Sequence, residues 1–156
     1  MQLRYIQYSP EELQEVKDIF LEYAQNLNVD LCFQRFEQEL ETLSKIYAPP
    51  QGCIILAYHG QEVAGCIALK PIAEGVCEMK RLYVKNAFRG HSLGRKLAQE
   101  AISFAKQNGY QTMKLDTLTT LHEAIGLYKS LGFQETPPYT FNPLDNVLYF
   151  ELNLAL

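Results

Sequence analysis

A short segment that combines glycines with basic side chains carries the strongest chemical signal in the sequence. Residues 88–97 read FRGHSLGRKL, and a helical pattern follows immediately. The first N–H groups of a helix have no partner inside it, and the helix dipole adds positive potential there. Small residues at Gly90, Ser92 and Gly94 let an anion approach that backbone closely. The segment therefore predicts a binding site for a phosphate or pyrophosphate group.

Two common nucleotide-binding motifs do not match this segment. A Walker motif requires Gly-Lys followed by serine or threonine, whereas Gly94 is followed by Arg95, and the spacing G-x-G-x-x-G is absent. Taken alone, the glycines also fit a helix start that needs only a tight turn. The surrounding sequence is therefore needed to distinguish an anion-binding site from a simple tight turn.

Hydrophobic periodicity predicts strands and helices on both sides of the glycine-rich segment. The predicted order is β-α-α-β-β-β-α-β-α-β-β. Strands are expected at residues 2–8, within 53–70 as a hairpin turning near 59–60, and at 76–84, 112–118, 133–136 and 146–154; helices are expected after Ser9 and at 33–46, 92–107 and 121–131. This order predicts an α/β fold, with a mixed sheet covered by helices. The strands at 76–84 and 112–118 should run parallel, because a helix connects them.

Several helix boundaries are marked by specific residues. Ser9 is the expected N-cap of the first helix, Pro10 occupies its first position, and Glu12 completes a capping box. Gly109 and Gly132 are expected to end the helices that precede them.

Length and composition bound the class of protein. The chain has 156 residues, which fits a single domain over 1–156, and 47% of them are hydrophobic, which argues against disorder. No apolar run approaches the roughly 20 residues that span a membrane, and the first residues lack the features of a signal peptide. We therefore expect a cytoplasmic protein with no membrane contact.

The charge is unevenly distributed along the chain. The formal net charge is −4, yet residues 78–114 carry eight basic residues against Glu78 and Glu100. A basic segment in an acidic protein favours a small anionic ligand over nucleic acid. A solvated basic helix face explains the charge equally well.

The four cysteines do not form a metal-binding pattern. Cys32, Cys53, Cys66 and Cys77 contain no Cys-x-x-Cys pair and no zinc-ligand spacing with histidine. We expect reduced, buried cysteines that act as small hydrophobic residues, and no bound metal.

Two segments resemble motifs of the GNAT superfamily of acetyl-CoA-dependent N-acetyltransferases. Residues 82–97, LYVKNAFRGHSLGRKL, strongly resemble its motif A, approximately L-Y-V-x-P-x-x-R-G-x-G-I-G-x-x-L, and residues 124–133, AIGLYKSLGF, resemble its later A-x-x-L-Y-x-x-L-G-F segment. Three departures stand out. Asn86 replaces a frequent proline, and Leu121 replaces an asparagine that many members place near the pantetheine arm. Ser92 replaces the middle glycine; its small side chain could cap the helix or contact a phosphate, so we expect binding to be retained.

The resemblance implies a fold and a cosubstrate. The fold would be a mostly antiparallel sheet of about seven strands flanked by about four helices, with a splayed parallel strand pair. Acetyl-CoA would lie with its pantetheine arm along the backbone of Leu82, Tyr83 and Val84, which also fit an ordinary core strand. Its pyrophosphate would bind at Arg89, Gly90, His91, Ser92, Leu93, Gly94 and Arg95. A solvated loop histidine is the alternative for His91.

The resemblance also assigns catalytic roles. Tyr128 matches a tyrosine that many members use as general acid, although its helical stripe also fits a plain core residue. Glu78 lies four residues before Leu82, where several members place a general base; the alternative is a solvent-facing strand residue. Asp116 could face the acceptor amine, but an ordinary exposed strand residue is the simpler interpretation.

The acceptor is expected to be a small-molecule or peptide amine. In the family it binds between the early helices and the last two strands. Candidate side chains there are Asp30, Arg35, Tyr139, Phe141 and Asp145. Two matters stay open: a non-catalytic CoA-binding sensor of the same fold is the alternative function, and a homodimer is a possible assembly.

Overall fold

The fold is built on one seven-stranded sheet. The computed structural model describes residues 1–27 and 35–155. The strands lie in the order β1-β2-β3-β4-β5-β7-β6, and every neighbouring pair is antiparallel except β4 with β5. The strands are β1 (Gln2–Tyr5), β2 (Cys53–His59), β3 (Glu62–Ala73), β4 (Val76–Val84), β5 (Thr112–Leu118), β6 (Gln134–Glu135) and β7 (Val147–Asn153).

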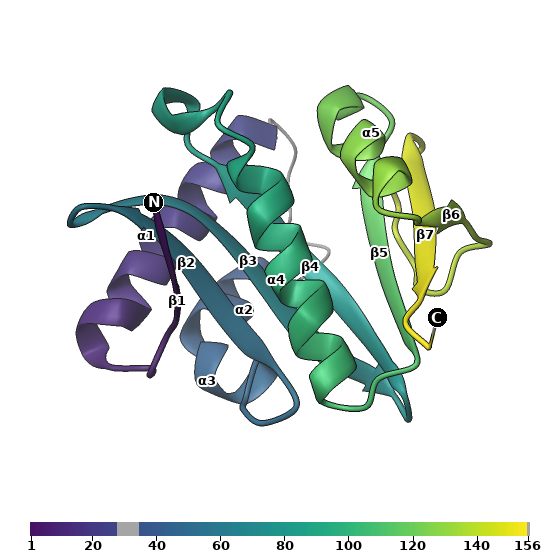
Figure 1. The fold of residues 1–156 in the computed structure, drawn as a ribbon, viewed down its shortest axis with the longest axis horizontal. Coiled ribbons are helices and arrows are strands. Elements are labelled where there is room, and N and C mark those ends of the chain that lie inside the picture. The colour runs from purple at the N-terminus through teal and green to yellow at the C-terminus, as the bar shows by residue number, and fades with distance from the viewer. Residues whose placement is uncertain (28–34, 156) are drawn as a thin grey trace.

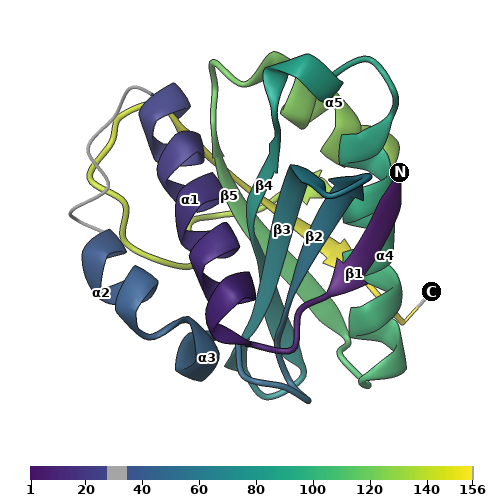
Figure 2. The ribbon, with the colours of Figure 1, turned by 90° about the vertical axis from the view of Figure 1, so that its left-hand side faces the viewer.

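Helices cover both faces of this sheet (Figures 1 and 2). One face carries α1 (Pro10–Leu27), α2 (Phe36–Glu41) and α3 (Leu43–Ile46); the other carries α4 (Leu93–Gln107) and α5 (His122–Ser130). Along β2, Ile55 packs into the apolar cluster beneath α4, whereas Ile54 and Leu56 pack into the cluster beneath α1. The central strands are therefore buried on both faces, as their nearly continuous apolar sequence requires.

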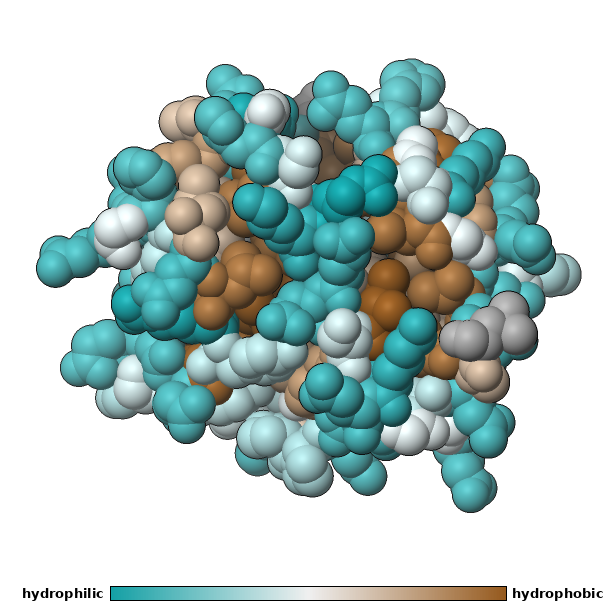
Figure 3. Space-filling view, viewed as in Figure 1, coloured by the Kyte–Doolittle hydropathy of each residue, from teal (hydrophilic) through white to brown (hydrophobic). Residues whose placement is uncertain are grey.

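The outer face of α4 is polar, and apolar side chains gather on both sides of it (Figure 3). On the side of β7, Ile102 of α4 and Leu152 of β7 line a surface hollow together with Leu131. No helix in residues 1–27 and 35–155 has the length and apolar character needed to cross a membrane.

The predicted order of strands and helices is confirmed, with two differences. A short 3-10 helix, η2 (Asn86–Phe88), lies between β4 and α4. The helix expected at 33–46 is two helices, α2 and α3, separated at Thr42, whose hydroxyl donates to the carbonyl of Gln38 at 2.7 Å. Residues 33 and 34 lie outside the described residues. A Ser or Thr side chain that bonds back to the preceding turn commonly bends a helix, and the sequence periodicity carried no sign of it.

The capping box predicted for the first helix is confirmed. The N–H of Glu12 donates to the Ser9 hydroxyl at 3.2 Å, and the N–H of Ser9 donates to the Glu12 carboxylate at 3.3 Å. Gly109 and Gly132 follow their helices with φ of 81° and 100°, a conformation that favours glycine.

The parallel strands β4 and β5 pair over only part of their length. The register joins Val76–Glu78 with Thr112–Lys114, and the strands then diverge, as Figure 1 shows. Beyond Glu78, the edge of β4 that faces β5 has no strand partner within residues 1–27 and 35–155. This is the splayed parallel pair that the family resemblance predicted, and it leaves backbone hydrogen-bonding groups of β4 without a sheet partner.

Candidate active site

The glycine-rich turn before α4 presents a row of backbone donors. The first helical bond of α4 runs from the N–H of Lys96 to the carbonyl of Ser92 at 3.1 Å. The N–H groups of residues 90–95 donate no hydrogen bond to any residue that the structure describes. Gly90, at the start of this row, has φ of 87°, a left-handed conformation that glycine adopts more readily than other residues. Such a row at a helix N-terminus is suited to an anion.

Ser92 does not cap the helix as the sequence suggested. It has a left-handed backbone (φ 59°, ψ 23°), and its side chain makes no capping hydrogen bond. N-cap side chains reach the first helical N–H groups from an extended backbone, so the left-handed geometry removes that bond. Ser92 thus keeps the conformation for which glycine is the usual residue.

The arginines beside the turn make contacts with the protein. Arg89 donates through Nε to the carbonyl of Val84 at 3.1 Å and lies over the ring of Tyr83. Arg95 donates to the hydroxyl of Ser130 at 2.7 Å and so links α4 to α5. His91 is exposed. The backbone is therefore the principal donor of this site, and the guanidinium groups flank it.

A cavity of about 70 Å³ lies where β4 and β5 diverge. Its lining comprises Tyr23, Leu27, Met79, Lys80, Arg81, Leu82, Asp116, Thr117, Leu118, Leu121, Ala124, Tyr128, Asn142 and Leu144. Leu82 and Tyr128, two of the predicted site residues, therefore share one cavity. Leu121, which replaces the family's frequent asparagine, adds an apolar side chain to the same wall.

A β-bulge shapes the β4 wall of this cavity. Cys66 pairs with Tyr83 and Ala68 with Lys80, so Arg81 and Leu82 together oppose a single residue of β3. Arg81 takes the left-handed conformation, with φ of 63°. A bulge redirects side chains and interrupts the ladder, and bulges are frequent beside active sites.

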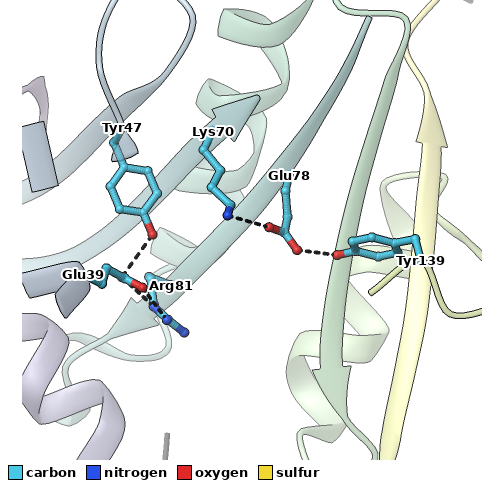
Figure 4. A network of polar contacts seen from close by, with 6 residues as sticks. All are labelled: Glu39, Tyr47, Lys70, Glu78, Arg81 and Tyr139. Carbon is cyan, nitrogen blue, oxygen red and sulfur yellow. Dashed lines mark hydrogen bonds and ion pairs between the residues drawn. The ribbon is translucent and has the colours of Figure 1, made fainter. Parts of the chain in front are cut away.

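A buried ion pair holds the bulge. Arg81 donates to Glu39 on α2 through two nitrogens, at 2.7 and 3.0 Å, and the Tyr47 hydroxyl donates to the same carboxylate at 3.0 Å (Figure 4). Burial alone would raise the pKa of Glu39, but the hydrogen bonds and charge of Arg81 bring this pKa below its ordinary value. Glu39 is therefore ionised at neutral pH and neutralises Arg81.

Tyr128 is both a core residue and a residue of the cavity, which the sequence analysis gave as alternatives. Its ring packs against Phe133 and Phe150 in the core, and it also lines the cavity. Its hydroxyl donates no hydrogen bond to any described residue. Burial raises the pKa of Tyr128 above that of an ordinary phenol, so the hydroxyl keeps its proton at neutral pH.

Glu78 is buried, which excludes the solvent-facing alternative. The hydroxyl of Tyr139 donates to its carboxylate at 2.6 Å, and Lys70 lies 3.7 Å away on the other side (Figure 4). The lining of the cavity does not include Glu78.

Asp116 and Lys80 are better placed than the sequence indicated. Asp116 on β5 is half-buried, lines the cavity and accepts a hydrogen bond from Asn142 at 3.4 Å, so the interpretation as an exposed strand residue was wrong. Lys80 lines the cavity from β4, and sequence reasoning missed it. The available signal was the pair Lys80-Arg81, two adjacent cations in a strand whose other charged residue is Glu78.

The remaining acceptor candidates are scattered. Tyr139 is the one that contacts a proposed catalytic residue, Glu78. Arg35, Phe141 and Asp145 are exposed, and none of them lines the cavity. Asp30 lies outside the described residues. Within the described chain, no group of three or more His, Cys, Asp and Glu side chains is arranged to hold a metal. Cys53, Cys66 and Cys77 are free and buried, as predicted for small hydrophobic residues.

Comparison with known proteins identifies the family. Residues 13–133 match the model of the acetyltransferase (GNAT) family. An uncharacterised N-acetyltransferase of Schizosaccharomyces pombe is 43% identical over 149 residues, which cover 94% of this chain and 91% of that protein. The chain therefore belongs to the GNAT acetyltransferase family and is an acyltransferase.

Solved structures share the fold. The crystal structure of a GNAT-family acetyltransferase from Staphylococcus aureus Mu50 superposes with a TM-score of 0.81 at 23% identity, covering 98% of this chain and 99% of that one. A putative acetyltransferase from Salmonella typhimurium, solved with its cofactor acetyl-CoA, superposes with a TM-score of 0.70 at 20% identity, covering 99% of this chain and 94% of that one.

Proposed function

We propose that this protein transfers an acetyl group from acetyl-CoA to a primary amine of a small molecule, amino acid or peptide, by direct attack in a ternary complex. The observation that carries the proposal is the continuity of three features along one path. These are the unpartnered N–H groups at residues 90–95, the unpaired edge of β4 beyond Glu78, and the cavity lined by Leu82 and Tyr128.

The first two features would hold the donor. The pyrophosphate of acetyl-CoA would bind the N–H groups at Gly90, His91, Ser92, Leu93, Gly94 and Arg95, with Arg89 beside them. The pantetheine arm is a chain of amides, and the backbone at Leu82, Tyr83 and Val84 would pair with it as a missing strand does. The structure of the Salmonella protein with acetyl-CoA supports this donor for the family fold.

The third feature would perform the chemistry. Acetyl-CoA supplies a thioester, whose carbonyl carbon forms the new C–N bond while its C–S bond breaks. A backbone N–H of β4 near Leu82 would stabilise the negative charge on the carbonyl oxygen. Tyr128 would give its phenolic proton to the departing thiolate, and Glu78 would accept the ammonium proton through water.

Two measurements test this proposal. Acetyl-CoA should raise the melting temperature of the protein, whereas acetylpantetheine, which lacks the diphosphate, should give little or no shift at the same concentration. A thiol-release assay with a panel of primary amines should then detect turnover. Equal shifts with both donors would contradict the diphosphate site, and binding without turnover on any amine would instead support the CoA sensor.

A further inference from the structure

Three charged side chains line the cavity between β4 and β5, and they are not equally neutralised. Lys80 and Arg81 come from β4, and Asp116 comes from β5. Glu39 already neutralises Arg81 through the buried ion pair. The charge that the cavity offers to a ligand is therefore set by Lys80 and Asp116.

Lys80 has no partner among the described residues. Its ammonium makes no hydrogen bond there and no ion pair within 4.0 Å, although Glu39, Glu78 and Asp116 lie close enough to act on its charge. Glu78 is engaged by Tyr139 and Lys70 instead. Burial, and then the nearby guanidinium of Arg81, lower the pKa of Lys80. A bound anion would favour the charged form of Lys80 and so oppose both of these effects on its pKa.

Asp116 presents the opposite charge from the other strand. Its carboxylate accepts one long hydrogen bond, from Asn142 at 3.4 Å, and forms no ion pair with Lys80. A carboxylate with this much unused acceptor capacity can bind an ammonium group. The cavity thus holds a cation on one wall and an anion on the other, and each lacks a strong partner in the part of the chain that the structure describes.

We infer that the acceptor is a small amine that also carries a carboxylate, as a free amino acid does, with Lys80 binding the carboxylate and Asp116 the ammonium group. This inference rests on the proposed acetyltransferase function. Leu27, Leu121 and Leu144 line the rest of the cavity and suit an apolar substituent.

The test compares matched acceptors. Each free amino acid is assayed beside its carboxamide and the amine left by removal of the carboxyl group. The readout is the ratio of kcat/KM between acid and amide, which cancels effects common to both. Replacing Lys80→Met should lower this ratio by about 10- to 100-fold, because one charge-assisted hydrogen bond is lost. Lys80→Arg should retain most of it.

The outcomes separate this inference from the proposed function. An unchanged acid-to-amide ratio in Lys80→Met would overturn the inference while leaving acetyl transfer intact. A fall in kcat on both acceptors would instead mark Lys80 as a general base and also overturn it. Acetyl-CoA binding with no turnover on any amine would overturn the proposed function and the inference together. The acetyl-CoA melting shift of each variant verifies that it folds.

Discussion

Arg81 and Glu39 form a buried, two-point ion pair that ties the bulge in β4 to helix α2. The two hydrogen bonds measure 2.7 and 3.0 Å, and the side chains are only 3% and 7% exposed. Arg81 has a left-handed backbone, and the next residue, Leu82, carries the proposed oxyanion contact. Helix α2 therefore fixes the backbone of β4 on which the donor is expected to lie.

Replacing Glu39→Gln should destabilise the protein strongly. The substitution leaves the Arg81 guanidinium buried without a counter-charge, and breaking a buried pair in this way typically costs about 3–5 kcal/mol. Denaturant unfolding at neutral pH measures the free energy of unfolding. Glu37→Gln, an exposed position on the same helix, is the matched control and should change it by less than about 0.5 kcal/mol. Equal effects of the two substitutions would contradict a structural role for the pair.

The same pair predicts a pH dependence with a defined sign. The pKa of Glu39 is lowered in the folded state. The stabilisation that the ionised carboxylate gives the folded protein is therefore fully present above the ordinary glutamate pKa of 4.5, and it is lost as the pH falls through the lowered value. The difference in unfolding free energy between the wild type and Glu39→Gln should therefore shrink as the pH drops below 4.5. A difference that stays constant into the acid range would argue against an ionised Glu39.

Gly94→Ala should separate stability from cofactor binding. A Cβ at Gly94 would lie 3.8 Å from Leu127 and 3.9 Å from Val84, which are ordinary contacts, and alanine favours a helix. The melting temperature should therefore hold or rise. Acetyl-CoA affinity should fall about tenfold, because the methyl group crowds the proposed ligand path, and calorimetric titration measures this change. Gly126→Ala on α5, with open space around it, should leave affinity unchanged.

Tyr128→Phe should remove turnover without affecting the fold. The hydroxyl has no partner among the described residues, so the melting temperature and acetyl-CoA binding should be unchanged. The kcat should fall at least about tenfold if the phenol protonates the thiolate. Tyr110→Phe is the control, because Tyr110 follows the far end of α4, roughly 22 Å from its start. A Tyr128→Phe enzyme with wild-type kcat would remove this residue from the mechanism.

Glu78→Gln tests the general base. Without this carboxylate the amine must lose its proton to solvent, so the pH–rate profile should shift to higher pH. Tyr139→Phe keeps the carboxylate but removes its 2.6 Å hydrogen bond, and should move the profile less. An unaltered profile in Glu78→Gln, with a shifted profile in Asp116→Asn, would transfer the role of base to Asp116.

Local signals in the sequence were sufficient for most of the fold. Ser9 and Glu12 make the predicted capping box, Gly109 and Gly132 follow their helices, and the element order is confirmed. The glycine-rich turn before α4 could be predicted because helix starts and small residues act over a few positions. The family resemblance, rather than periodicity, singled out Tyr128 as a candidate general acid, and the structure places it in the lining of the cavity.

The features that the sequence could not predict depend on long-range contacts. A bulge places two residues opposite one, which leaves no periodic signal, so Arg81 could not be assigned to Glu39 forty-two positions away. The burial of Glu78 depends on Tyr139, sixty-one positions later. Lys80 and Asp116 line the same cavity because β4 and β5 diverge after three paired positions.

The most direct measurement is a crystal structure of the protein with acetyl-CoA. The account predicts diphosphate oxygens within about 3 Å of the backbone nitrogens of residues 90–95. It also predicts the thioester beside Leu82 and Tyr128. A diphosphate bound elsewhere, or a donor that leaves the gap between β4 and β5 unfilled, would contradict it.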